Sequence, residues 1–82
     1  MAVTVRCLGV FRELGDSFTV DEPVQSVADL RVACDGYLTA LGRQDLVSVL
    51  KRSVFASDDL VLRDSDVEVP ATVSVLPPVA GG

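Results

Sequence analysis

A stretch of helical periodicity, set among segments that alternate like strands, constrains the fold of this chain most. Apolar residues recur at a helical spacing over residues 27–41, which would form one face of a helix of about four turns. Ser26, followed three residues later by Asp29, resembles a helix-start capping pair, and Gly42 is a typical helix stop. Charged residues such as Asp29 and Arg31 fall on the opposite face. The sequence therefore predicts one amphipathic helix that needs an apolar surface to cover it.

Segments that alternate apolar and polar residues lie on both sides of this helix. Residues 3–8 and 17–20 have the two-residue period of a half-buried strand, and the connection 11–16 predicts a β-hairpin with a long turn. After the helix, strand-like runs occur at 46–50, extending toward 54–55, and at 60–62, 67–69 and 72–76. A helix packed on one face of a mixed sheet buries both apolar faces. We expect an α+β fold with four to five strands and one main helix.

The chain is small and acidic. With 82 residues, it buries about 60% of the surface that its unfolded form exposes, which leaves little room for an enclosed active site. Its 12 acidic and 7 basic residues argue against nucleic-acid binding, which rests on clustered Lys and Arg. Carrier, modifier or interaction functions fit this size, and basic protein surfaces fit this charge. No apolar stretch approaches the roughly 20 residues of a membrane span, and no leader pattern opens the sequence, so we expect a cytoplasmic protein without a membrane partner.

The cysteines offer no obvious chemistry. Cys7 and Cys34 lie at no metal-ligand spacing, and the sequence contains no histidine that could complete a metal site or a catalytic dyad. Both fall at core positions of the predicted strand and helix. We expect buried free thiols in a reducing compartment, and no metal.

The last six residues differ from the rest of the chain. Pro77 and Pro78 directly follow the last predicted strand, and because they lack N–H donors they end it and direct the next residues away from the sheet. Gly81 and Gly82 carry no Cβ, so their backbone can thread a channel too narrow for side chains. We expect a domain over residues 1–76 and a flexible tail over 77–82 that reaches roughly 20 Å beyond the sheet. The carboxylate of Gly82 is the expected reactive group.

The order of elements and the ending together resemble a known family. A hairpin, a helix and further strands before a terminal diglycine resemble the ubiquitin-like β-grasp sulfur carriers. Residues 76–82, Leu-Pro-Pro-Val-Ala-Gly-Gly, resemble the ending of the MoaD-type small subunits of molybdopterin synthase. Residues 12–15, Arg-Glu-Leu-Gly, lie in the first hairpin connection, where those proteins commonly carry a similar Arg-Glu followed by Gly. Residues 62–67 resemble their Leu-x-Asp-Gly-Asp-x-Val turn, with Ser65 in place of the Gly.

The resemblance implies a β-grasp fold and a role in sulfur transfer. An ATP-using adenylating enzyme of the ubiquitin-activating type would convert the Gly82 carboxylate to an acyl-adenylate, and a persulfide would displace AMP to leave a thiocarboxylate. A larger molybdopterin synthase subunit would then use this sulfur to form the dithiolene. The chain would be a non-catalytic donor subunit that binds no cofactor of its own. Three alternatives stay open: a sulfur carrier for another pathway (thiamine, cysteine or a thio-natural product), a ubiquitin-like protein modifier, or an interaction domain whose diglycine is inert.

A docking surface is expected next to the tail. Leu8 and Leu76 fall on the polar sides of their strands, so both are predicted to project away from the helix-covered core. Val54 is a third candidate. The predicted partner-binding residues are Leu8, Val54, Leu76, Pro77, Pro78, Val79, Ala80 and Gly81.

Overall fold

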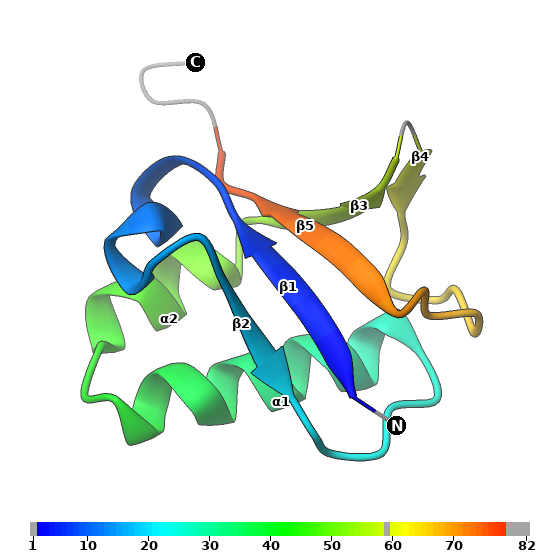
Figure 1. Cartoon of the computed structure of the whole chain (residues 1–82), viewed down its shortest axis with the longest axis horizontal. Coiled ribbons are helices and arrows are strands. Elements are labelled where there is room, and N and C mark those ends of the chain that lie inside the picture. Colours follow the sequence, from blue (N-terminus) through cyan, green and yellow to red (C-terminus); the bar gives the residue numbers. More distant parts are fainter. Residues whose placement is uncertain (1, 59, 79–82) are drawn as a thin grey trace.

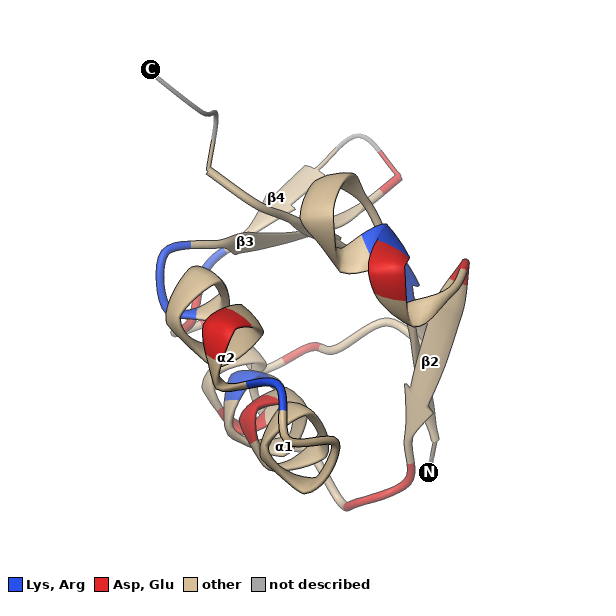
Figure 2. Ribbon diagram, turned by 90° about the vertical axis from the view of Figure 1, so that its left-hand side faces the viewer, with Lys and Arg blue, Asp and Glu red and all other residues tan. Residues whose placement is uncertain are grey.

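Five strands form one mixed sheet in the computed structural model, which describes residues 2–58 and 60–78. They are β1 (Val3–Cys7), β2 (Ser17–Val20), β3 (Val54–Ser57), β4 (Leu60–Leu62) and β5 (Thr72–Leu76), in the order β2-β1-β5-β3-β4. β1 and β5 pair in parallel at the centre, and the other neighbours are antiparallel. Helix α1 (Val27–Ala40) covers one face, and the shorter helix α2 (Gln44–Leu50) lies beside it (Figures 1 and 2). The fold is the expected α+β arrangement, a β-grasp.

The core lies between α1 and the inward face of the sheet. Alternation in β1 and β5 turns Val5 and Val75 inward, together with their equivalents along each strand, while the residues between them face the other way. Phe55 of β3 and Phe11, from the 3-10 helix η1 (Gly9–Leu14), are buried in the same core. The α1 side chains buried against this surface are Val27, Leu30, Ala33, Cys34 and Leu38. The helix-period stripe and the strand-period stripes are therefore the two halves of one core.

The start of α1 follows the predicted capping pair. The Ser26 hydroxyl accepts a hydrogen bond from the Asp29 N–H at 3.1 Å, and the Asp29 carboxylate accepts one from the Gln25 N–H at 3.1 Å. Such a cap satisfies N–H groups that have no partner within the helix. At the other end the chain leaves the helix through Gly42, whose φ of 75° suits a residue without a Cβ. The predicted helix is confirmed.

The strand predicted at residues 46–50 is wrong, because these residues belong to α2. Leu46, Val47 and Leu50 are buried, a spacing of one and four residues that places them on one face of a helix and on both faces of a strand. The α2 face packs against α1 and extends the core beyond the first helix. A short apolar run fits either element until its packing partner is known.

The strand predicted at residues 67–69 is also wrong: between β4 and β5 the chain runs as an irregular segment, 63–71. The carbonyls of Asp66 and Asp64 accept hydrogen bonds from the N–H groups of Val27 and Ala28, at 2.9 and 3.1 Å. The backbone of this segment therefore caps the first turn of α1, where N–H groups lack partners within the helix. This segment therefore forms hydrogen bonds with the start of a helix, where the sequence predicted hydrogen bonds with a neighbouring strand.

Candidate functional site at the exit of the chain

Three neighbouring strands bring the predicted docking residues together. β5 lies between β1 and β3, and the register pairs Cys7 with Val75 and Val54 with Leu76. Leu8 directly follows Cys7, so it lies beside Leu76 at the same end of the sheet. Val54 is 40% exposed, and the two leucines are half-buried. We call Leu8, Leu76 and Val54 the exit row, because the chain leaves the sheet directly after it.

The prolines that follow the exit row differ in exposure. Pro77 is half-buried and Pro78 is exposed. The remaining predicted tail residues lie outside the described part of the chain, and they include the proposed reactive group: Val79, Ala80, Gly81 and Gly82. The exit is thus defined up to Pro78.

Apolar surface extends from the exit row toward the edge of the sheet. Ala56 lies two residues beyond Val54, on the same side of β3, and its register partner in β4 is Val61. Val61 is 64% exposed and Ala56 is half-buried. The sequence did not predict this extension, since the three-residue strand is too short for its alternation to identify the outward face. A partner seated on the exit row would meet a continuous apolar strip across β5, β3 and β4.

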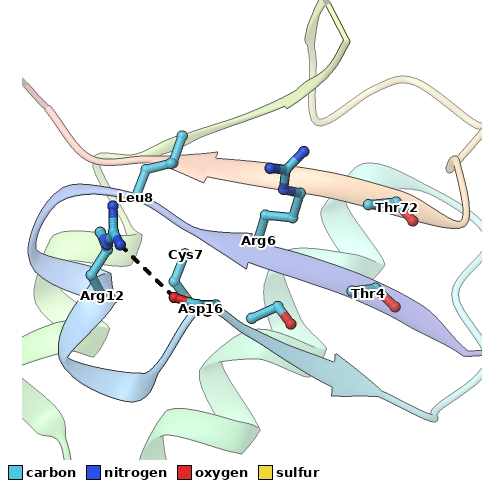
Figure 3. Close-up of a pocket in the computed structure, with 8 residues that line it drawn as sticks. Thr4, Arg6, Cys7, Leu8, Arg12, Asp16 and Thr72 are labelled. Carbon is cyan, nitrogen blue, oxygen red and sulfur yellow. Dashed lines mark ion pairs between the residues drawn. The ribbon is translucent and has the colours of Figure 1, made fainter.

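The other half of this face is polar. Apart from Leu76, the outward positions of β1, β2 and β5 are threonines, serines and Arg6, and among the described strands Arg6 is the only charged residue. Figure 3 shows Arg6, Thr4 and Thr72 around a shallow depression of about 430 Å³, with Arg12 turned toward Asp16. That ion pair is long, at 3.8 Å, and both side chains are well exposed. Such a surface offers hydrogen-bond donors and acceptors to a partner but does not enclose a reactant.

The two cysteines are buried free thiols, as predicted. Burial raises the pKa of Cys7, and the nearby carboxylate of Asp16 adds to this. Burial raises the pKa of Cys34 to about 12. Because the thiolate is the nucleophilic form, neither side chain is activated for chemistry at neutral pH.

The Arg-Glu-Leu-Gly motif fixes η1 to the rest of the fold. The Arg43 guanidinium donates to Glu13 at 2.7 Å and to Asp45 at 2.9 Å, so it links η1 to the start of α2. The same hydrogen bond from Arg43 lowers the pKa of Asp45. Leu14 packs against the core, and Gly15 has a φ of 115°, which suits only a residue without a Cβ. The motif supports the loop that follows Leu8.

A clamp around Arg31 was not predicted, because this residue falls on the polar face of the helix stripe. Its guanidinium reaches the end of α2, donating to the carbonyls of Leu50 at 2.6 Å and Ser53 at 2.8 Å. It also donates to both carboxylate oxygens of Asp64 and lies over the Phe55 ring at 5.1 Å. The only signal in the sequence is that Arg, unlike Lys, can satisfy several acceptors at once.

Within residues 2–58 and 60–78, no group of three or more His, Cys, Asp or Glu side chains is placed to hold a metal ion. No helix in that part of the chain is long and apolar enough to span a bilayer. Comparison with protein-family models and with curated proteins found no match to this chain.

Proposed function

We propose that this chain is a sulfur carrier, the small subunit of a molybdopterin synthase, that holds sulfur as a thiocarboxylate on Gly82. The observation that carries the proposal is the position of the exit row. Leu8, Leu76 and Val54 form one apolar line at the strand end from which the chain leaves through Pro77. A partner that covers this line receives the following residues at a fixed place and in a fixed direction. The β-grasp fold supports the same proposal.

The proposed chemistry takes place on the terminal carboxylate, which is ionised at neutral pH and therefore a poor electrophile. A carboxylate oxygen attacks the α-phosphorus of ATP, and pyrophosphate leaves. The outer sulfur of a protein persulfide attacks the carbonyl carbon, and AMP leaves. A thiol of the donor enzyme then reduces the resulting acyl disulfide, which gives the thiocarboxylate on Gly82 and a disulfide on the donor. The adenylating enzyme supplies the ATP site, and the carrier supplies a carboxylate that can reach it.

The large synthase subunit is the proposed acceptor. Its docking surface would be apolar opposite the exit row and Val61, and basic around it, because the carrier has a net charge of −5. Gly81 and Gly82 would enter its active site, where the absence of Cβ atoms permits a narrow channel. Sulfur would then pass to a pterin precursor to form the dithiolene.

Mass spectrometry of the last tryptic fragment tests the loading step. The chain is incubated with a ubiquitin-activating-type adenylating enzyme, ATP and a persulfide donor, then cleaved after Arg63. The fragment 64–82 contains no Met or Cys, so oxidation of a sulfur side chain cannot imitate an oxygen-to-sulfur exchange, which has nearly the same mass. We expect that exchange on Gly82. Reactions without ATP, and a chain that lacks Gly82, are the controls.

The outcomes separate the alternatives. An unchanged fragment, under conditions in which the same enzymes load an established carrier, refutes the proposal. Isopeptide adducts between Gly82 and lysines of other proteins identify a modifier. A thiocarboxylate that forms but is not consumed by a molybdopterin synthase large subunit identifies a carrier for another pathway. Full biological activity after deletion of Gly82 identifies an interaction domain.

A further inference from the structure

The first residue of η1 touches the first residue of the tail. Gly9 follows Leu8 directly and has a φ of 57°, in the left-handed region. A Cβ built on Gly9 would lie 2.5 Å from Cγ of Pro77 and 3.4 Å from its Cδ. Real Cβ atoms do not approach another atom as closely as 2.5 Å, so no larger residue fits here unless Pro77 moves. The half-buried face of Pro77 is therefore seated on the bare backbone of Gly9.

Conformation alone does not account for this contact. Gly15 and Gly42 also have positive φ values, of 115° and 75°, yet a Cβ built on either would meet nothing within 4 Å. Those two glycines permit turns. Among the glycines within residues 2–58 and 60–78, only Gly9 combines a left-handed backbone with a close neighbour, and that neighbour is Pro77 at the tail exit.

We propose that Gly9 is a positioning residue that sets the direction in which the chain leaves the sheet at Pro77 and Pro78, an inference that rests on the function proposed above. The ring of Pro77 fixes its own φ, so a contact that holds the ring also holds the line of the backbone entering Pro78. Leu8 and Gly9 then have complementary roles. Leu8 belongs to the apolar line that a partner covers, and Gly9 aims the segment that the partner must receive.

A shift of Pro77 matters once a partner covers the exit row, because the residues that follow must then reach the reacting group from a displaced starting point. To restore an ordinary contact, a Cβ at 2.5 Å must push Pro77 by about 1 Å, and five residues of about 3.3 Å each follow before the carboxylate. A misplacement of about 1 Å at a reacting group can cost about 100-fold in rate. We therefore expect Gly9→Ala to lower the maximal rate of thiocarboxylate formation by about 10- to 100-fold. The carrier concentration at half-maximal rate should change less than about threefold, since the exit row is intact.

Matched variants separate aiming from backbone strain. Gly42→Ala places an alanine at a left-handed φ of 75° without a neighbour, so we expect this variant to keep the wild-type rate. Pro77→Ala removes the Cγ and Cδ atoms that the new Cβ would strike. In that background, Gly9→Ala should cost less than about threefold in rate. A full additional loss in the double variant would overturn the proposal.

A second measurement does not depend on sulfur chemistry. Residual dipolar couplings of Leu76 and of the amides that follow Pro78 report the direction in which the free chain leaves the sheet, and we expect Gly9→Ala to change them while Gly42→Ala does not. Unchanged couplings overturn the proposed role of Gly9. Failure of any enzyme to load the wild-type chain refutes only the proposed function, and the couplings still test Gly9 in that case. If Gly9→Ala does not fold, Pro77→Ala is the test instead. Removing the ring must alter the same couplings, and unchanged couplings in that variant overturn the proposal.

Discussion

Replacing Arg31 with alanine removes a guanidinium that joins three parts of the fold. Its Nη1 atom donates to the carbonyls of Leu50 and Ser53, at 2.6 and 2.8 Å, where the chain leaves α2 for β3. Its Nε and Nη2 atoms donate to Asp64, in the segment that caps α1. The guanidinium carbon lies 5.1 Å from the centre of the Phe55 ring. The variant should therefore lose stability without losing any part of the exit row.

The size of the loss follows from the surroundings of each contact. The Ser53 carbonyl would lose a charged donor, worth about 1.5–3 kcal/mol. The Leu50 carbonyl also accepts a hydrogen bond from the Ser53 N–H at 3.0 Å, so losing the Arg31 donor at this carbonyl costs less. The Asp64 side chain is 53% exposed, and such an ion pair contributes about 0–1 kcal/mol. Contact with the Phe55 ring adds about 0.5–2 kcal/mol. Because neighbouring terms are not additive, we expect a total of about 2–4 kcal/mol.

Urea unfolding followed by far-ultraviolet circular dichroism measures this loss. With a slope of about 1 kcal/mol per molar urea for so small a domain, the midpoint should fall by about 2–4 M. Asp64→Asn is the matched control, because it weakens the ion pair but leaves both carbonyl contacts, and it should cost less than about 1 kcal/mol. A loss below about 1 kcal/mol for Arg31→Ala, or equal losses in the two variants, would refute the assignment of stability to the carbonyl contacts.

Three further predictions concern the exit row, the loss of stability at alkaline pH and the cap of α1. Val54→Asp should weaken binding to the large subunit by roughly 30-fold in a titration, because it places a charge in an apolar contact, whereas Thr19→Asp on the polar half of the face should change affinity less than about threefold. Folded Cys34 has a pKa of about 12 against 9.0 for a free thiol, so its contribution is complete below about pH 9 and lost between about pH 9 and 12, by about 1.4 kcal/mol per pH unit. Cys34→Ala should flatten that part of the stability curve; an unchanged slope would show that this thiol does not titrate there. Ser26→Ala should cost about 1 kcal/mol in urea unfolding, and a loss near zero would mean that the hydroxyl does not cap α1.

Local pattern predicted those elements whose packing face their own residues specify. The helix over 27–41 has an apolar stripe, a cap and a stop, and β1 and β5 alternate over five residues each. The run 46–50 does not distinguish a helix from a strand, because its residues are apolar except for Ser48. It becomes a helix because Leu46, Val47 and Leu50 can then pack together into the core beside α1, which is a tertiary effect.

Leu8 and Leu76 could be assigned to the outward face from the sequence, but their position beside Val54 could not be predicted. That Leu8, Leu76 and Val54 form a line depends on β5 inserting between β1 and β3, and alternation does not encode strand order. The sequence also placed Arg31 on the solvent face of its helix, because helical periodicity does not reveal contacts with distant segments. Its acceptors come from residues 50, 53 and 64, which only the folded chain brings within reach.

The parallel pairing of β1 with β5 ties presentation of the tail to completion of the protein. These are the first and last strands in chain order, so their contact closes the longest loop in the sheet and comes late on the ribosome. Without β5, the sheet divides into a β1–β2 hairpin and a β3–β4 hairpin with no shared edge. An interrupted or misfolded chain therefore has neither the exit row, where we propose that a partner docks, nor the contact between Gly9 and Pro77. In the proposed carrier, only completely folded molecules would dock on the adenylating enzyme, so ATP would be consumed only for them.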